Sequence, residues 1–412
     1  MDGCLILFLG ITVLLLMLLL KLPLWLVFVS AALFTALLAG GPGFIPEAVY
    51  TVSVDHATID LVVIMYLIAA FVSLYKSTGF IDRLGRELAL FLRKPFIVAS
   101  FVPALLGLLP VPGGALMSIP VVDSVGDYMG LDKDRKLFIN VWYRHVIFIV
   151  YPISSVLVLT ASLTGTTVFD LVIRQAPIAL SMLFIGYVIG FPRKYRKTSS
   201  ELFREEADKK LLLEVFSPII VSIVIALSTS KFLDYRLSYI PVNRLSLLLG
   251  ISIGIALLMI LSKTGLRDLG KAFTSKTSIE MALVGYGAML LKWVFSSIDL
   301  SCITEYMPIG LSPAVFVMSI PLFFSLVSGI PTAGIALSIP ILRELTTITS
   351  ATASLIYISS FIGYLSSPLH LCYIYTAQYL GISITRGYKY LIPASIACLL
   401  YTSPSPRDLS TS

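Results

Sequence analysis

A break motif occurs twice in this chain, each time inside strongly apolar sequence. PVPGGALMSIPVV at Pro110–Val122 resembles IPTAGIALSIPIL at Ile330–Leu342, with Gly, Ser, Ile and Pro in the same register. In a bilayer, non-helical backbone is tolerated only where it is buried in protein or lines a water-filled cavity. Two such breaks at corresponding positions of two halves indicate the binding site of a secondary transporter.

The composition is that of a membrane protein. The 412 residues are 57% hydrophobic and only 13% charged, with a mean hydropathy of +0.95, whereas soluble domains carry roughly a quarter charged residues. We therefore expect an all-α polytopic protein of the cytoplasmic membrane, in contact with the lipid bilayer. The net charge of +7 comes mostly from short basic clusters between apolar spans, as in cytoplasmic loops, and we expect no nucleic-acid partner.

Apolar segments near the length of a spanning helix, about 20 residues, recur along the chain. We expect spans at residues 4–20, 22–38, 60–75, 138–163, 172–191, 211–228, 243–262, 280–295, 353–379 and 388–401. Two further apolar regions, residues 96–122 and 313–342, contain the matched breaks. We expect both to be re-entrant hairpins, which enter and leave the membrane on one face.

The charges of the loops give the two halves opposite orientations. Residues 76–94 hold five Lys and Arg and predict an amphipathic helix on the inner surface, whereas residues 40–58 hold none and should lie outside. In the second half the pattern is reversed, because residues 263–276 hold four basic residues and residues 296–310 hold none. Matching segments thus face opposite sides, as an inverted-topology repeat requires.

The sequence therefore predicts two inverted repeats, each with about five transmembrane helices and one hairpin. The first repeat covers residues 1–191 and its hairpin faces the cytoplasm, while the second covers residues 211–401 and its hairpin faces outward. Residues 192–210 carry RKYRK and KK and form a cytoplasmic connector. In the tail at residues 402–412, SPSPRDLSTS resembles translated adapter or vector sequence, and a short native tail is the alternative.

The helix breaks supply the candidate binding groups. Half-helices that end inside a membrane expose N–H groups that suit an anion and carbonyl groups that suit a cation. Pro152 and Pro368 also interrupt the span after each hairpin, beside hydroxyl groups. The expected substrate-binding residues are Pro112, Gly113, Gly114, Ser118, Asn140, Arg144, His145, Ser154, Ser155, Thr332, Ala333, Gly334, Ser338, Ser366, Ser367 and His370. The candidate sodium positions lie near Gly114, Ser154, Gly334 and Ser366.

Each candidate has a structural alternative. Arg144 either pairs with an anionic substrate or extends to the inner surface of the membrane. His145 and His370 either carry protons or substrate, or are satisfied interhelical hydrogen-bonding groups. The serines at the breaks either line a site or bond to their own backbone. The four cysteines form neither a CxxC pair nor a Cys/His ligand spacing, and we expect them to be packing residues.

The motifs also resemble a known family. PVPGGALMSIPVV followed by NVWYRHVIFIVYP resembles an uncharacterised prokaryotic family of integral membrane proteins in the ion transporter superfamily, over about residues 22–400. That superfamily includes divalent anion:sodium symporters, gluconate permeases and the large membrane subunit of TRAP transporters. The resemblance implies two inverted repeats, a scaffold that forms a homodimer, an elevator-like movement, and sites at the hairpin tips and helix breaks. The tips here depart from the Ser-Asn-Thr triplet of the sodium:dicarboxylate pattern.

Together these features predict a secondary active transporter for a small anionic solute, an organic carboxylate or an inorganic oxyanion, coupled to Na⁺ or H⁺. No HExxH, GxSxG or ATP-binding P-loop occurs in the sequence, and we expect neither an enzyme nor a cofactor beyond the coupling ion. Two alternatives are an intramembrane enzyme with a Ser154/His370 site and an ion channel.

Overall fold

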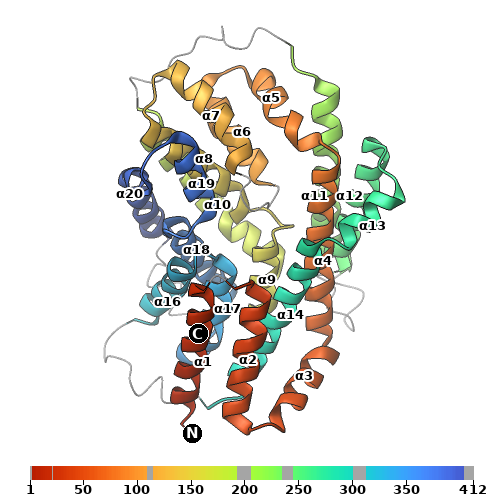
Figure 1. Ribbon diagram of the computed structural model, residues 1–412, viewed down its shortest axis with the longest axis vertical. Helices are drawn as coiled ribbons and strands as arrows, with labels where there is room; N and C mark the ends of the chain where they lie inside the picture. Colours follow the sequence, from red (N-terminus) through yellow and green to blue (C-terminus); the bar gives the residue numbers. More distant parts are fainter. Residues whose placement is uncertain are drawn as a thin grey trace.

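The computed structural model describes residues 2–20, 22–108, 115–192, 206–233, 245–299 and 312–402. These residues form helices and their connections, with no β-strand among them (Figure 1). The helices of the first half are α1 (Gly3–Leu19), α2 (Leu24–Gly40), α3 (Phe44–Val54), α4 (His56–Ser77), α5 (Phe80–Leu92), α6 (Pro95–Gly107), α7 (Ala115–Met129), α8 (Lys133–Val146), η1 (Ile147–Ile149), α9 (Ser155–Thr164) and α10 (Val168–Gly190). Those of the second half are α11 (Lys209–Leu233), α12 (Leu245–Ser262), α13 (Leu266–Phe273), α14 (Lys276–Ser296), α16 (Pro313–Ser328), α17 (Pro331–Leu345), α18 (Ser350–Ser366), α19 (Leu371–Leu380) and α20 (Ile384–Thr402).

Several helices are long and apolar enough to cross a membrane. Within the described residues there are six such candidates, namely α4, α10, most of α11, α12, α14 and the stretch Ser350–Leu380 formed by α18 and α19. On α10 and α11, large apolar side chains such as Leu180, Phe184 and Ile220 are exposed, which suits a face in contact with lipid rather than water. The chain is therefore an all-helical membrane protein.

Helices lie in all ten predicted spans, but two of these spans are interrupted. The span at residues 138–163 is divided into α8, η1 and α9, and the span at residues 353–379 is divided into α18 and α19. The interruptions contain Pro152 and Pro368. Proline ends a helix because it has no N–H to donate and its ring clashes with the carbonyl four residues earlier. The predicted helix breaks are confirmed.

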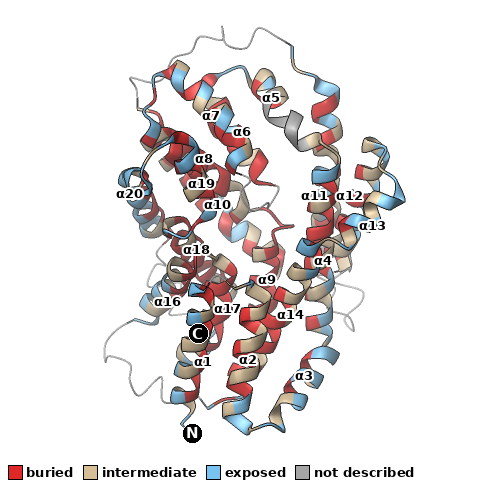
Figure 2. Cartoon of the chain, viewed as in Figure 1, coloured by how far each residue is buried: buried red, intermediate tan, exposed pale blue. Residues whose placement is uncertain are grey.

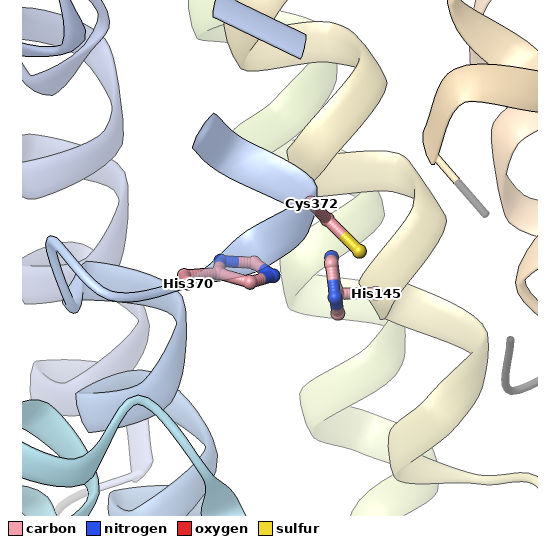
Figure 3. Close-up of side chains that lie close together, drawn as sticks. All are labelled: His145, His370 and Cys372. Atoms are coloured by element: carbon pink, nitrogen blue, oxygen red, sulfur yellow. The ribbon is translucent and has the colours of Figure 1, made fainter. Parts of the chain in front are cut away.

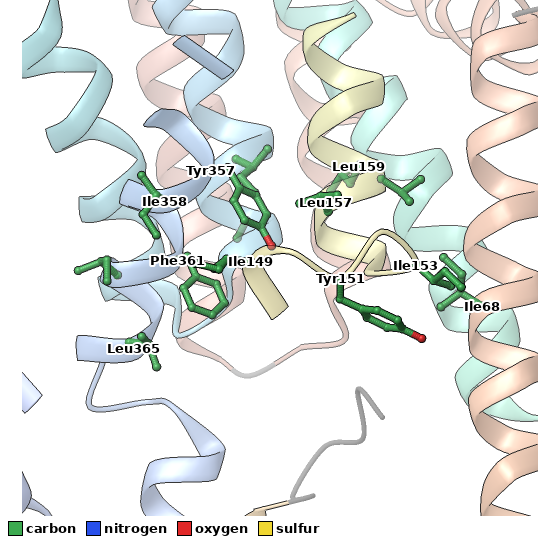
Figure 4. Packing of buried hydrophobic residues seen from close by; sticks show 14 of the residues in the cluster. Ile68, Ile149, Tyr151, Ile153, Leu157, Leu159, Tyr357, Ile358, Phe361 and Leu365 are labelled. Carbon is green, nitrogen blue, oxygen red and sulfur yellow. The ribbon is translucent and has the colours of Figure 1, made fainter. Parts of the chain in front are cut away.

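The backbone at the first break is enclosed by apolar side chains. Ile149 lies beside Phe361 of α18, and Ile153 lies beside Ile68 of α4 (Figure 4). All four side chains are buried in the core of the protein. Non-helical backbone at membrane depth must be buried in protein or line a cavity, and this segment meets that condition.

Each predicted hairpin region contains two helices that pack against each other, α6 with α7 and α16 with α17. The second pair turns at Gly329, whose φ is +67° and where an added Cβ would lie 2.8 Å from the Cβ of Leu369. Glycine is required there because the left-handed backbone and the close approach both disfavour a side chain. Residues 109–114, which include Pro112, Gly113 and Gly114, lie outside the described residues.

Side chains cap the N-termini of α4 and α8 in the first half of the sequence and of α14 and α18 in the second. Asp55 begins α4 by accepting a hydrogen bond of 2.9 Å from a first-turn backbone N–H, and Ser275 begins α14 in the same way at 3.2 Å. Asp132 and Thr349 cap α8 and α18 at 2.9 and 3.2 Å. Such caps satisfy N–H groups that have no partner within the helix.

The helices form two groups (Figure 1). In the first group α4 packs on α14 and α12, α2 packs on α14, α11 packs on α12, and α1, α3 and α13 lie beside them. In the second group α6 and α7 pack on α8, α16 and α17 pack on α18, and α10 and α20 contact both α8 and α18. Helix α9 contacts α4 and α14 of the first group and α17 and α18 of the second.

Buried residues occur in both groups (Figure 2), and helices α8 and α18 of the second group are buried over most of their length. Helix α18 buries 13 of its 17 residues, so it lies inside the protein rather than against lipid. Because the buried faces of α8, α9, α17 and α18 meet near the two helix breaks, the polar groups at these breaks are surrounded by protein.

Candidate functional site

Three helices begin around one cavity of about 280 Å³. They are α9 and α19, which follow the two helix breaks, and α17, the second helix of the second hairpin region. The residues that these three helix starts contribute to the lining are Ser154, Val156, Gly329, Ile330, Pro331, Thr332, Leu371 and Cys372. The remaining lining residues are Leu24, Arg144, His145, Phe148, Met281, Tyr357, Phe361 and Tyr364.

The helix starts give the cavity a positive character. The N-terminus of a helix carries a partial positive charge and presents N–H groups that have no partner in the helix. The residues before α9, α17 and α19 are Ser154, Ile330 and His370, and none of these three forms a capping hydrogen bond through its side chain. No Asp or Glu occurs among the described residues that line the cavity. The arrangement suits an anion.

Arg144 adds a full positive charge to the same wall. It lies in the last turn of α8, is only 1% exposed and lines the cavity. The alternative in which Arg144 extends to the inner surface is therefore wrong, because its side chain stays inside the protein. An arginine in the lining of a cavity can form paired, charge-assisted hydrogen bonds with a carboxylate or oxyanion.

His145 and His370 meet at the junction of α8 and α19, together with Cys372 (Figure 3). The two imidazole rings are 4.7 Å apart between centroids, and the three side chains are buried. His145 Nδ1 lies 2.6 Å from the carbonyl oxygen of Val141, and its Nε2 lies 3.4 Å from the Tyr364 hydroxyl. The His370 ring approaches the carbonyl of Leu365, but neither ring nitrogen has hydrogen-bond geometry to any described residue.

Asn140, one turn before Arg144 on α8, has a different environment. Its Nδ2 donates to Thr376 Oγ1 at 2.9 Å and to the carbonyl of Ala115 at 3.2 Å. Its Oδ1 accepts a hydrogen bond of 2.6 Å from Ser118. Neither Asn140 nor Ser118 lines the cavity. These two predicted site residues instead connect α7, α8 and α19.

Of the four serines at the helix breaks, Ser154 alone lines the cavity. Ser155 is the buried first residue of α9. Ser366 bonds to Ser395 of α20 at 3.3 Å, and Ser367 donates to the carbonyl of Leu326 in α16 at 2.6 Å. These two serines were predicted to bind substrate. In the structure their hydroxyl groups instead hydrogen-bond the second helix break to α16 and α20.

At the start of α17, Thr332 lines the cavity and Ala333 is fully buried beside it. A Cβ added at Gly334 would lie 1.8 Å from Ser325 Oγ, so this glycine allows α17 to pack closely on α16. Ser338 donates to the carbonyl of Gly334 in its own helix. Of the two roles considered for this serine, lining a site or bonding to its own backbone, the structure shows the second.

The candidate sodium positions are not all at the cavity. Ser154 lines it, but Gly334 lies in the contact between α16 and α17, and Ser366 bonds to α20. Gly114 lies outside the described residues. His370 lies beside His145 and is not among the lining residues.

Sequence reasoning missed three groups at the site. Tyr357 and Tyr364 of α18 line the cavity, and the Tyr357 hydroxyl donates to the carbonyl of Phe148 at 2.9 Å. Cys372, expected to be a packing residue, lies with two histidines instead. The sequence did contain a signal for Cys372, because His370 and Cys372 are two residues apart and directly follow the helix break at Pro368.

Comparison with known protein families identifies the family to which the chain belongs. The family model described as "Protein of unknown function (DUF401)" matches residues 2–402, which include both groups of helices and the whole cavity lining. No curated protein matches the chain. Because the match spans almost the full sequence, the chain belongs to the DUF401 family.

Proposed function

We propose that the chain is a secondary active transporter, which moves a small anionic solute across the cytoplasmic membrane by alternating access. The observation that carries this proposal is the convergence of three helix N-termini and Arg144 on one cavity. An organic carboxylate or an inorganic oxyanion would accept hydrogen bonds from the helix starts and from the guanidinium. The volume of about 280 Å³ suits a small solute.

We further propose that the two halves are inverted repeats. The order of elements from α6 to α10 corresponds to that from α16 to α20: a helix pair, a buried helix, a break, a short helix and a long helix. The short helices α9 and α19 have 10 residues each, and both begin at the cavity. The matched caps of α4 and α14, and of α8 and α18, support the same correspondence.

The proposed orientation places the N-terminus outside and the first hairpin region open to the cytoplasm. Helix α5, which is flanked by Lys76, Arg93 and Lys94, lies at the opposite end of the longest axis from α3 and the N-terminus (Figure 1). Basic segments remain on the cytoplasmic side. In this orientation the second hairpin region opens outward.

The two groups of helices fit an elevator-type movement. In this proposal the group of α1–α4 and α11–α14 is the scaffold through which a homodimer forms. The group with the hairpin regions and helix breaks moves and carries the cavity. The resemblance of the break motifs to those of the ion transporter superfamily supports this division. His145 and His370 are the candidates for H⁺ coupling, and the hydroxyls and carbonyls at the breaks are the candidates for Na⁺ coupling.

The test is uptake of labelled anions into proteoliposomes that contain the purified protein. Small carboxylates and oxyanions are compared under an imposed Na⁺ gradient and under an imposed pH gradient. A preceding thermal-shift screen selects ligands, because a ligand that binds only the folded state stabilises it by mass action. We expect at least one anion to raise Tm and to be taken up under one of the two gradients.

Arg144→Gln is the decisive variant. A hydrogen bond to a charged group contributes about 1.5–3 kcal/mol, so uptake should fall by roughly tenfold or more. Arg174→Gln is the matched control, because Arg174 is an exposed residue on α10. Equal uptake by Arg144→Gln and the unmodified protein, or no uptake of any anion, would contradict the proposal.

A further inference from the structure

His145, His370 and Cys372 also form a set of possible metal ligands, of which the transport proposal uses only the two histidines, as candidates for H⁺ coupling. One ligand atom from each residue lies within 4.8 Å of the others, and all three side chains are buried. The rings of the two histidines and the sulfur of Cys372 are directed toward a common point (Figure 3). They come from α8, from the residue before α19 and from the first turn of α19. The fold, rather than a local motif, brings them together.

His145 is already oriented as a ligand. Its Nδ1 lies 2.6 Å from the carbonyl oxygen of Val141, and because a carbonyl only accepts, Nδ1 carries the proton. The lone pair is therefore on Nε2, whose contact with the Tyr364 hydroxyl is long, at 3.4 Å. Metal-bound histidines usually donate their other ring N–H to a carbonyl or carboxylate in this way.

His370 is the second, independent indication of a ligand. It is 0% exposed, and although its ring approaches the carbonyl of Leu365, neither ring nitrogen has good hydrogen-bond geometry to a described residue. Buried polar groups in native proteins nearly always have a partner, and an exception calls for an explanation. A metal ion bound to the nitrogen that faces His145 would supply the missing partner.

Cys372 can provide the anionic ligand. Its thiol is not part of a disulfide and lies in the first turn of α19, and a cysteine binds a metal ion as the deprotonated thiolate. Ion binding would release the thiol proton, so binding should strengthen as the pH rises. The thiolate also offsets part of the charge of the ion beside Arg144.

We propose that these three residues bind one late first-row transition-metal ion, of which Zn²⁺ is representative, with a fourth coordination position open to the cavity. Two imidazoles and a thiolate favour zinc-like ions over Mg²⁺ or Ca²⁺, which prefer oxygen. In tetrahedral zinc sites the ligand atoms lie about 3.3–3.6 Å apart, so the three side chains must move inward by about 1 Å. Since His145 and Cys372 also line the cavity, the open position faces the proposed solute. The ion site does not require transport.

The test uses Co²⁺ as a spectroscopic substitute for Zn²⁺, added to purified, metal-stripped, full-length protein in detergent. A thiolate bound to Co²⁺ gives a charge-transfer absorption that neither imidazole nor carboxylate ligands produce. We expect this absorption to saturate at one ion per chain, to disappear when Zn²⁺ is added, and to persist in excess Mg²⁺.

Cys372→Ser should abolish the charge-transfer absorption, and His370→Gln should weaken Co²⁺ binding by about tenfold or more. The matched controls are Cys398→Ser, at the other buried free cysteine, and His56→Gln, at an exposed histidine. Both controls should retain the absorption.

The spectrum of the unmodified protein decides the outcome even if Cys372→Ser does not fold. Folded, unmodified protein without a thiolate band would overturn the proposal, as would a band that persists in folded Cys372→Ser. Anion uptake is measured separately, with and without a chelator. An absence of anion uptake would therefore not contradict the metal-site proposal. An absence of the charge-transfer band would not contradict the transport proposal.

Discussion

Two polar clusters lie about one turn apart on α8 and differ in how completely their groups are bonded. In the Asn140 network, which comprises Ser118, Asn140 and Thr376, the side-chain amide makes three hydrogen bonds. In the His145 cluster, which comprises His145, His370 and Cys372, His370 makes no hydrogen bond of good geometry to any described residue.

Both clusters connect α8 to the region of α19, but they differ in whether their polar groups can still bind a ligand. Burial of a polar group costs free energy unless the group is hydrogen-bonded, so a complete network stabilises one arrangement of helices. An incomplete cluster beside a cavity retains bonding capacity for a ligand. The polar residues of α8 were predicted to form one binding site. In the structure Asn140 belongs to a hydrogen-bond network between helices, whereas Arg144 and His145 line the candidate site.

The largest expected effect separates the two clusters by stability. Asn140→Ala would leave the Ser118 hydroxyl and the Ala115 carbonyl with one bond fewer, and loss of a buried partner costs about 1–3 kcal/mol. His370→Gln should cost less, because the ring nitrogens lose no hydrogen bond of good geometry within the described chain. Tm in detergent, without metal or anion, is the measurement. If Tm fell further in His370→Gln than in Asn140→Ala, the His145 cluster rather than the Asn140 network would be the more important for stability.

A smaller effect tests the bond between the halves. Thr376→Val removes the acceptor of the 2.9 Å hydrogen bond from Asn140, and a typical bond contributes about 1 kcal/mol. Thr160→Val is the matched control, because Thr160 is also buried and donates to its own helix at Val156. We expect Tm to fall further in Thr376→Val than in Thr160→Val. Equal decreases would show that the connection to Asn140 contributes nothing.

The smallest effect concerns the paired serines of the break motif. Ser118 bonds across to α8, whereas Ser338 bonds to the carbonyl of Gly334 in its own helix. Ser338→Ala should therefore change the stability by less than about 0.5 kcal/mol, and Ser118→Ala should cost about 1 kcal/mol. Thermal unfolding of the two variants under identical conditions measures the difference. An equal cost would mean that the motif serines have the same role in both halves.

Much of the helical framework was predictable because its causes are local. Apolar length predicted helices in every span, and proline chemistry predicted the interruptions at Pro152 and Pro368. The candidate site was predictable in part. Arg144, His145, Ser154 and Thr332 line the cavity as expected of polar groups in apolar sequence. Ser118 and Ser338 have the same motif context but different partners, which no local rule distinguishes.

The sequence by itself determined that the chain is helical and apolar enough for a membrane, where its helices are broken, and which polar residues lie within apolar segments. The tertiary structure decided which of those residues meet. His145 and Cys372 are far apart in the chain, and only the packing of α8 against α19 brings them together. Hydropathy and proline act over a few neighbouring residues, whereas a site is a property of long-range packing, and for that reason Cys372 could be identified only after the chain was folded.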